Sequence, residues 1–170
     1  PYICIFKHIT MIISVTNLKG GVGKTTISTN LAVSLTQHKY DICLIDTNLE
    51  QKSALEWSEN RAEYNNSMNH ITTIGLTVKQ LETQIEDIAK RYDHVIIDGS
   101  PQLQELADII ILASDVVLIP LAPSLYDVRG FEKFLNRFTR IKSLKERAGQ
   151  KLEGFAILNK VLHNSNLTKD

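Results

Sequence analysis

The sequence has 170 residues, of which 43% are hydrophobic and 22% charged, as expected for a globular domain with a core of its own. Basic and acidic residues number 19 each, so any nucleic-acid surface must be a local patch. Cys4 and Cys43 have neither disulfide-framework nor metal-ligand spacing, and no apolar stretch approaches the roughly 20 residues of a membrane span. We therefore expect a cytoplasmic protein that makes no membrane contact.

Residues 1–10 come before Met11 and lack the small-residue cleavage site of a signal peptide. We expect them to be an N-terminal extension or a cloning remnant, with a short extra strand as the alternative.

A glycine-rich segment, T-N-L-K-G-G-V-G-K-T-T at 16–26, follows the apolar run 12–15 and precedes apolar residues with helical spacing over 27–35. Strand, glycine-rich turn and helix together form the context in which such a loop binds phosphate. Glycines let backbone N–H groups turn inward, and the new helix adds its positive N-terminal end. The residues expected to hold a nucleotide are Gly20, Gly21, Val22, Gly23, Lys24, Thr25 and Thr26.

Within this loop, Lys24 is placed to reach the β- and γ-phosphates, and the Thr25 hydroxyl is placed to ligate Mg²⁺. The ordinary phosphate-loop pattern has glycine where this chain has Leu18, and a second lysine, Lys19, begins the run K-G-G-V-G-K-T-T. This run closely resembles the deviant Walker A box of the ParA/MinD family of P-loop ATPases. The resemblance implies that ATP bridges a homodimer, with Lys19 reaching the nucleotide of the other subunit. The alternative is a glycine-rich turn with incidental lysines.

Strands and helices alternate along the rest of the chain. The near-continuous apolar strands predict a three-layer α/β/α fold of the P-loop NTPase type, with a mostly parallel sheet. The expected strands are 41–46, 71–74, 95–98, 116–119 (ended by Pro120) and 154–158, and the expected further helices are a short one around 53–57, 78–89, 102–114 and 131–148. The apolar stripe of the last helix is expected to comprise Phe131, Phe134, Leu135, Phe138, Ile141 and Leu144.

Two expected strands end in aspartate, Asp46 and Asp98, and both should emerge at the carboxyl edge of the sheet, where ligands of such folds bind. Asp98 matches a Walker B aspartate that holds Mg²⁺ through water. Asp46 begins a segment that resembles the family's first switch, which implies that it contacts Mg²⁺ and positions the attacking water. The family's second aspartate and proline are here Asn48 and Leu49, which predicts slow turnover. Alternatively, Asp46 caps the loop.

Residues 99–101 follow Asp98 as a switch-like turn that could sense the γ-phosphate, and the alternative is an ordinary strand-to-helix connection. The resemblance also implies contacts with the adenine base. Pro120 lies in a proline-containing loop expected near the base, and Asn159 ends a strand where family members place a residue that touches adenine. The plain alternative for Asn159 is an ordinary turn residue.

The long helix near the end of the chain carries many basic residues. Such a face is either a solvated surface or a source of phosphate contacts for non-specific double-stranded DNA. The residues are Lys133, Arg137, Arg140, Lys142, Lys145 and Arg147, with Lys151 beyond them.

The resemblance spans 11–160, the expected ATPase domain, and leaves 161–170 as a polar tail that is truncated relative to the family. It implies a weak Mg²⁺-dependent ATPase that segregates DNA, associates with the nucleoid and works with a ParB-like centromere-binding partner. Alternatives are a nucleotide-binding dimerisation module without turnover, a MinD-like division regulator, and a fragment that does not fold alone. The polar tail argues against the regulator, which needs an amphipathic membrane-targeting segment.

Overall fold

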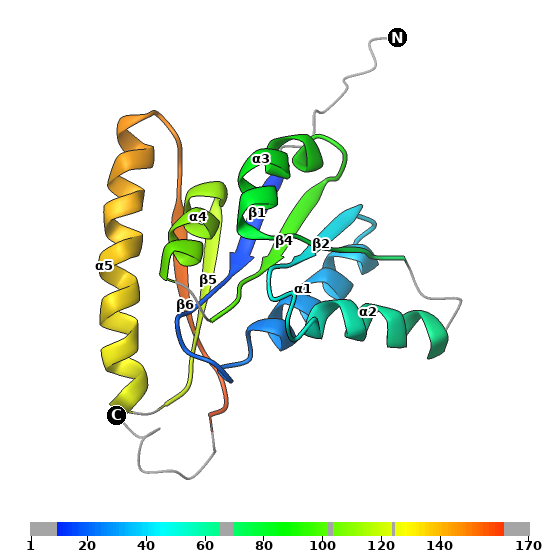
Figure 1. Ribbon diagram of the computed structural model, residues 1–170, viewed down its shortest axis with the longest axis horizontal. Helices are drawn as coiled ribbons and strands as arrows, with labels where there is room; N and C mark the ends of the chain where they lie inside the picture. Colours follow the sequence, from blue (N-terminus) through cyan, green and yellow to red (C-terminus); the bar gives the residue numbers. More distant parts are fainter. Residues whose placement is uncertain (1–9, 65–69, 102–103, 124, 162–170) are drawn as a thin grey trace.

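The computed structural model describes residues 10–64, 70–101, 104–123 and 125–161. The sequence-based expectations for residues 1–9 and 162–170 lie outside these ranges. Six parallel strands form one sheet in the order β3-β2-β4-β1-β5-β6 (Figure 1). The strands are β1 (Met11–Val15), β2 (Ile42–Asp46), β3 (Thr72–Gly75), β4 (His94–Asp98), β5 (Val116–Leu121) and β6 (Glu153–Leu158). The helices are α1 (Lys24–Gln37), α2 (Ser53–Tyr64), α3 (Val78–Ala89), α4 (Gln104–Ala113) and α5 (Leu125–Arg147).

Alternate residues of the central strands face opposite helical layers, which confirms the predicted three-layer architecture. On one face, residues such as Cys43 and Val95 pack against α3 and α4. On the other face, residues such as Leu44 and Ile96 pack with Ala32 of α1 and Ala54 of α2. The central strands β2 and β4 are nearly continuous apolar runs because both of their faces are covered.

The register of the sheet brings the strand-ending aspartates together. Asp46 of β2 is the direct partner of Asp98 in β4, and Asp98 is also the partner of Val15, the residue that ends β1. The phosphate loop begins immediately after Val15. Parallel pairing therefore places the loop and both carboxylates at one edge of the sheet, as predicted.

Helix α5 covers β5 and β6 with a narrower apolar face than the sequence suggested. Phe134, Phe138 and Ile141 are buried, and a Cβ on Gly154 would lie 2.5 Å from the Phe138 ring. Leu135 is 41% and Leu144 54% exposed, so the prediction that both belong to the buried stripe is wrong. The next residue on the buried face after Phe134, Phe138 and Ile141 is Lys145, whose helical spacing puts it where Leu144 was expected.

Some boundaries also differ from those predicted. Helix α2 runs on to Tyr64, α5 begins at Leu125, and β5 continues through Pro120 instead of ending before it. The proline is tolerated because β1 and β5 pair only as far as Val15 and Leu118. The backbone at position 120 faces β1, beyond the last hydrogen bond between β1 and β5. Proline, which has no N–H, therefore removes no hydrogen bond from the sheet. No helix in the described ranges is long and apolar enough to cross a membrane.

Candidate functional site

The phosphate loop turns on glycines with left-handed backbone conformations. Gly21 has φ 73° and Gly23 has φ 96°, values that residues with a Cβ rarely adopt. Gly23 is the N-cap of α1, and the first turn of this helix carries no acidic side chain. A pocket of about 330 Å³ lies at this end of α1 and is lined by Gly20, Gly21, Gly23 and Thr26 among others. The N-terminal N–H groups of the helix give this end a positive partial charge.

Lys24 lies buried at the start of α1, and its Nζ donates a 2.7 Å hydrogen bond to the backbone oxygen of Lys19. Burial lowers the pKa of Lys24 to about 8, partly opposed by the charge of Asp98. The loop is braced by Asn17, whose side chain accepts from the Lys19 N–H and donates 2.7 Å to the Pro120 oxygen. Asn17 was not predicted as a site residue, because only the fold brings β5 next to it.

Asp98 receives two hydroxyl hydrogen bonds from the first turns of α1. Thr25 Oγ1 donates to one carboxylate oxygen at 2.6 Å, and Ser28 Oγ donates to the other at 3.0 Å. Burial raises the pKa of Asp98 to about 6, although the hydroxyl groups favour the charged form. The structure thus brings together Thr25 and Asp98, two of the three residues predicted to hold Mg²⁺. Ser28 was missed, although it lies one helical turn after Lys24.

The Asp46 carboxylate is fully buried and accepts hydrogen bonds from backbone N–H groups. It accepts from Asn48 at 2.8 Å, from Ala54 at 2.9 Å and from Leu55 at 3.3 Å, so it closes the turn before α2 and binds the N-terminal end of that helix. This is the capping role that the sequence left as an alternative. Asp46 also lines the pocket, and its roles toward water and Mg²⁺ stay predictions.

The segments after β2 and β4, which correspond to the two predicted switches, are joined through Thr47. Its hydroxyl donates to the Asp98 backbone oxygen at 2.7 Å and accepts from the Ser100 N–H at 3.0 Å. Gly99 is required beside them, because a Cβ there would lie 2.6 Å from the Thr16 hydroxyl oxygen. The Thr47 hydroxyl therefore joins the two segments directly.

Asn159 contacts the phosphate loop itself. Its Nδ2 donates 2.9 Å to the Val22 oxygen, and a Cβ on Gly23 would collide with this amide. The end of β6 is thus joined to the loop that follows β1. The predicted adenine contacts of Asn159 and Pro120 stay predictions.

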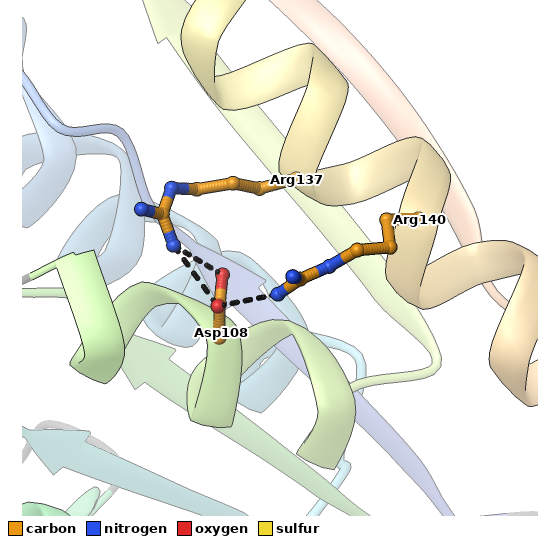
Figure 2. Close-up of polar contacts among 3 residues, drawn as sticks. All are labelled: Asp108, Arg137 and Arg140. Atoms are coloured by element: carbon orange, nitrogen blue, oxygen red, sulfur yellow. Dashed lines mark hydrogen bonds and ion pairs between the residues drawn. The ribbon is translucent and has the colours of Figure 1, made fainter.

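Three of the basic residues predicted to form a DNA-binding face are used within the fold. Arg137 forms two hydrogen bonds with Asp108 of α4, at 2.9 and 3.0 Å, and Arg140 forms a third at 2.9 Å (Figure 2). Lys145 is buried and donates to the backbone oxygens of Leu112 and Ser114 at the end of α4. Lys133, Arg147 and Lys151 remain exposed.

The parallel sheet, the glycine loop and the Thr25–Asp98 pair define a protein of the P-loop NTPase fold. A family model described as an AAA domain matches residues 10–80 and 66–153. Most of the chain is therefore covered, and the chain belongs to this family, among the ParA/MinD-type P-loop ATPases.

Named relatives agree with this assignment. The sporulation initiation inhibitor protein Soj of Bacillus subtilis is 26% identical over 160 residues, covering 74% of this chain and 63% of Soj.

Solved structures share the fold. A plasmid partition protein from Borrelia burgdorferi has a TM-score of 0.69 at 21% identity, covering 92% of this chain and 81% of that one. The septum site-determining protein MinD from Pyrococcus horikoshii, in complex with Mg-ADP, has a TM-score of 0.65 at 21% identity, covering 94% and 73%. Among the curated relatives with the strongest matches, the chain spans 63% to 76% of their lengths.

Proposed function

We propose that this chain is the ATPase domain of a partition protein, which binds ATP and Mg²⁺, dimerises around the nucleotide and hydrolyses it slowly. The observation that carries the proposal is the arrangement of Lys24, Thr25 and Asp98 around one pocket at the N-terminal end of α1. It combines a cation, a helix N-terminus and two kinds of oxygen ligand within a single site.

The donor set fits the proposed cofactors. Inward-facing N–H groups and Lys24 suit phosphate oxygens. The Thr25 hydroxyl and the Asp98 carboxylate are oxygen ligands of the kind that Mg²⁺ takes beside phosphates and water. Bound Mg²⁺ would neutralise negative charge on the phosphates while the terminal phosphoryl group is transferred to water. Toward this chemistry, Lys24 would supply fixed positive charge and Asp98 would hold the metal through its ionised form.

The proposal for the whole protein follows the family pattern. Lys19 from each subunit would contact the nucleotide of the other, and the ATP-bound dimer would hold double-stranded DNA without sequence preference. A ParB-like partner would stimulate hydrolysis and release the DNA. The exposed Lys133, Arg147 and Lys151 are the residues of the predicted basic region best placed for phosphate contacts.

Calorimetric titration of ATP and Mg²⁺ into the wild-type chain and its Lys24→Ala variant tests the nucleotide site. We expect binding to the wild type and its loss in the variant, with the same thermal unfolding transition in both. Absence of binding to a folded wild-type chain would contradict the proposal.

A nucleotide-binding module without turnover is the second candidate, and the contacts of Asp46 support it. Both carboxylate oxygens accept backbone N–H groups, and Asn48, which stands where the family has its second aspartate, carries no charge and bonds to Gln51. ATP binding and dimerisation without phosphate release, even with DNA and partner present, would favour this candidate over the ATPase.

A MinD-like positioning ATPase would use the same site, and the structural likeness to MinD supports it to the same degree as partition. Co-sedimentation of the ATP-bound protein with duplex DNA or with anionic lipid vesicles separates the two. Binding to DNA alone supports partition, whereas binding to vesicles alone supports the MinD-like function.

A further inference from the structure

Lys160 lies on the wall of the phosphate-loop pocket, although it is far from the loop in the sequence. Two contacts of the preceding residue put it there. The Asn159 N–H donates 2.7 Å to the Leu121 oxygen, and its side chain donates to the Val22 oxygen of the loop. The chain then turns, and Lys160 takes up a left-handed backbone conformation with φ 58°.

This conformation is unfavourable for a residue with a Cβ, and turns that need it usually employ glycine or asparagine. The turn after β6 therefore does not explain why the residue is lysine. Two other exposed lysines also have positive φ, Lys39 after α1 (66°) and Lys52 before α2 (49°), but neither lines the pocket. What distinguishes Lys160 is an unfavourable conformation together with a place at the site, a combination typical of functional positions.

The charges of the pocket suggest what the lysine binds. Asp46 and Asp98 are its acidic lining residues, and both are held by hydrogen bonds from neighbouring elements. Lys24 is buried beneath the loop, whereas Lys160 is exposed to solvent. Lys160 lines the same pocket as Gly20, Gly21 and Gly23 of the loop, and phosphate is a ligand that both backbone N–H groups and an ammonium group bind.

We propose that Lys160 binds the phosphate chain of the nucleotide, as a second cation from the same subunit besides Lys24. The inference rests on the proposed nucleotide-binding function and adds a residue to its site. Asn159 acts as the positioning residue, because its bond to Val22 fixes the end of β6 against the loop.

The test compares Lys160→Gln with the matched control Lys39→Gln, which removes the charge of an exposed lysine in the same conformation elsewhere. Each variant and the wild type are titrated with ATP and with inorganic tripolyphosphate, both in the presence of Mg²⁺. We expect Lys160→Gln to weaken the binding of both ligands about twofold to fivefold, as for loss of one solvent-exposed ion pair, and Lys39→Gln to bind them as the wild type does.

A second variant separates binding from folding. Lys160→Gly relieves the left-handed conformation, so it should unfold at the same or a higher temperature than the wild type and still bind both ligands more weakly. Affinities equal to those of the control would overturn the inference. Weaker ATP binding with unchanged tripolyphosphate binding would overturn it too, because the contact would then be to the base or ribose. No binding to the wild type would overturn the proposed function, and this inference with it.

Discussion

The ammonium group of Lys24 is hydrogen-bonded at 2.7 Å to the backbone oxygen of Lys19, five residues earlier in the same loop. These are the two lysines for which different partners are proposed, the nucleotide of their own subunit and that of the other subunit. An ammonium group has three N–H donors, so Lys24 can hold the Lys19 oxygen and a phosphate at the same time. Lys24 would therefore connect a bound phosphate to the segment that carries Lys19, the lysine proposed to bridge the dimer.

Replacing Lys19 with alanine should leave ATP binding by the monomer intact, because the partner of Lys24 is a backbone oxygen that alanine retains. The variant should nevertheless fail to form ATP-dependent dimers, since it lacks the side chain proposed to cross the interface. Light scattering with and without ATP measures the dimer, and calorimetry measures binding. A dimer equal to that of the wild type would contradict the ATP-bridged model.

ATP binding should depend on pH through Lys24, whose pKa is lowered to about 8. Below this pH the amine is charged and attracts phosphate, so affinity should fall as the pH rises from 7 to 9. Bound phosphate favours the charged form and raises the pKa again, so binding at pH 8 should take up about half a proton. Calorimetry at pH 8 in two buffers with different ionisation enthalpies measures this uptake, which should be smaller at pH 7. Equal uptake at both pH values would argue against the assignment to Lys24.

Asp98→Asn should stabilise the nucleotide-free protein at pH 8 while abolishing Mg²⁺-dependent binding. Burial raises the pKa of Asp98 from 3.8 to about 6, so the folded state holds this proton more tightly than the unfolded state does. The contribution of Asp98 to the free energy of unfolding therefore falls as the pH rises from about 4 to about 6, and it stays low at higher pH. The neutral side chain avoids this cost, which amounts to about 1–3 kcal/mol. Urea unfolding at pH 5 and pH 8 tests the sign. The variant should gain more at pH 8, and an equal change at both pH values would exclude the explanation.

Asp108→Asn should strengthen any binding of DNA by α5, because the carboxylate now neutralises Arg137 and Arg140 (Figure 2). We expect a gain of about twofold to fivefold at low salt that disappears at high salt, since each released cation adds a phosphate contact. Fluorescence anisotropy with a labelled duplex measures the affinity. Asp87→Asn, which removes an exposed acid paired with Lys90 on α3, is the control. A change equal to that of the control would place DNA elsewhere on the protein.

The sequence predicted the part of the site that lies within short segments or at strand ends. The glycine loop is contiguous, and the pairing of Asp46 with Asp98 follows from two parallel strands ending level. The contacts of Asp46 with Ala54 and Leu55 were harder to predict, because they depend on how the chain returns to begin α2.

The docking of α5 was the least predictable feature. Arg137 and Lys145 appeared as parts of a solvated basic face, yet both bind groups of α4. The sequence contained one indication that Lys145 is buried, because its helical spacing puts it on the same face as Phe134 and Ile141. Whether such a lysine is buried depends on acceptors supplied by another helix, and the sequence of α5 alone does not contain them.

The central position of β1 sets the order in which a newly made chain can mature. Ribosomal synthesis delivers β1 before β4 and β5, the strands that pair with it, and the Asn159 contact with Val22 arrives later still. An apolar strand and its glycine loop must therefore wait for most of the polypeptide to emerge, a situation that favours protection by a chaperone. The phosphate loop, which is translated early, is therefore among the last parts of the fold to have all of its contacts.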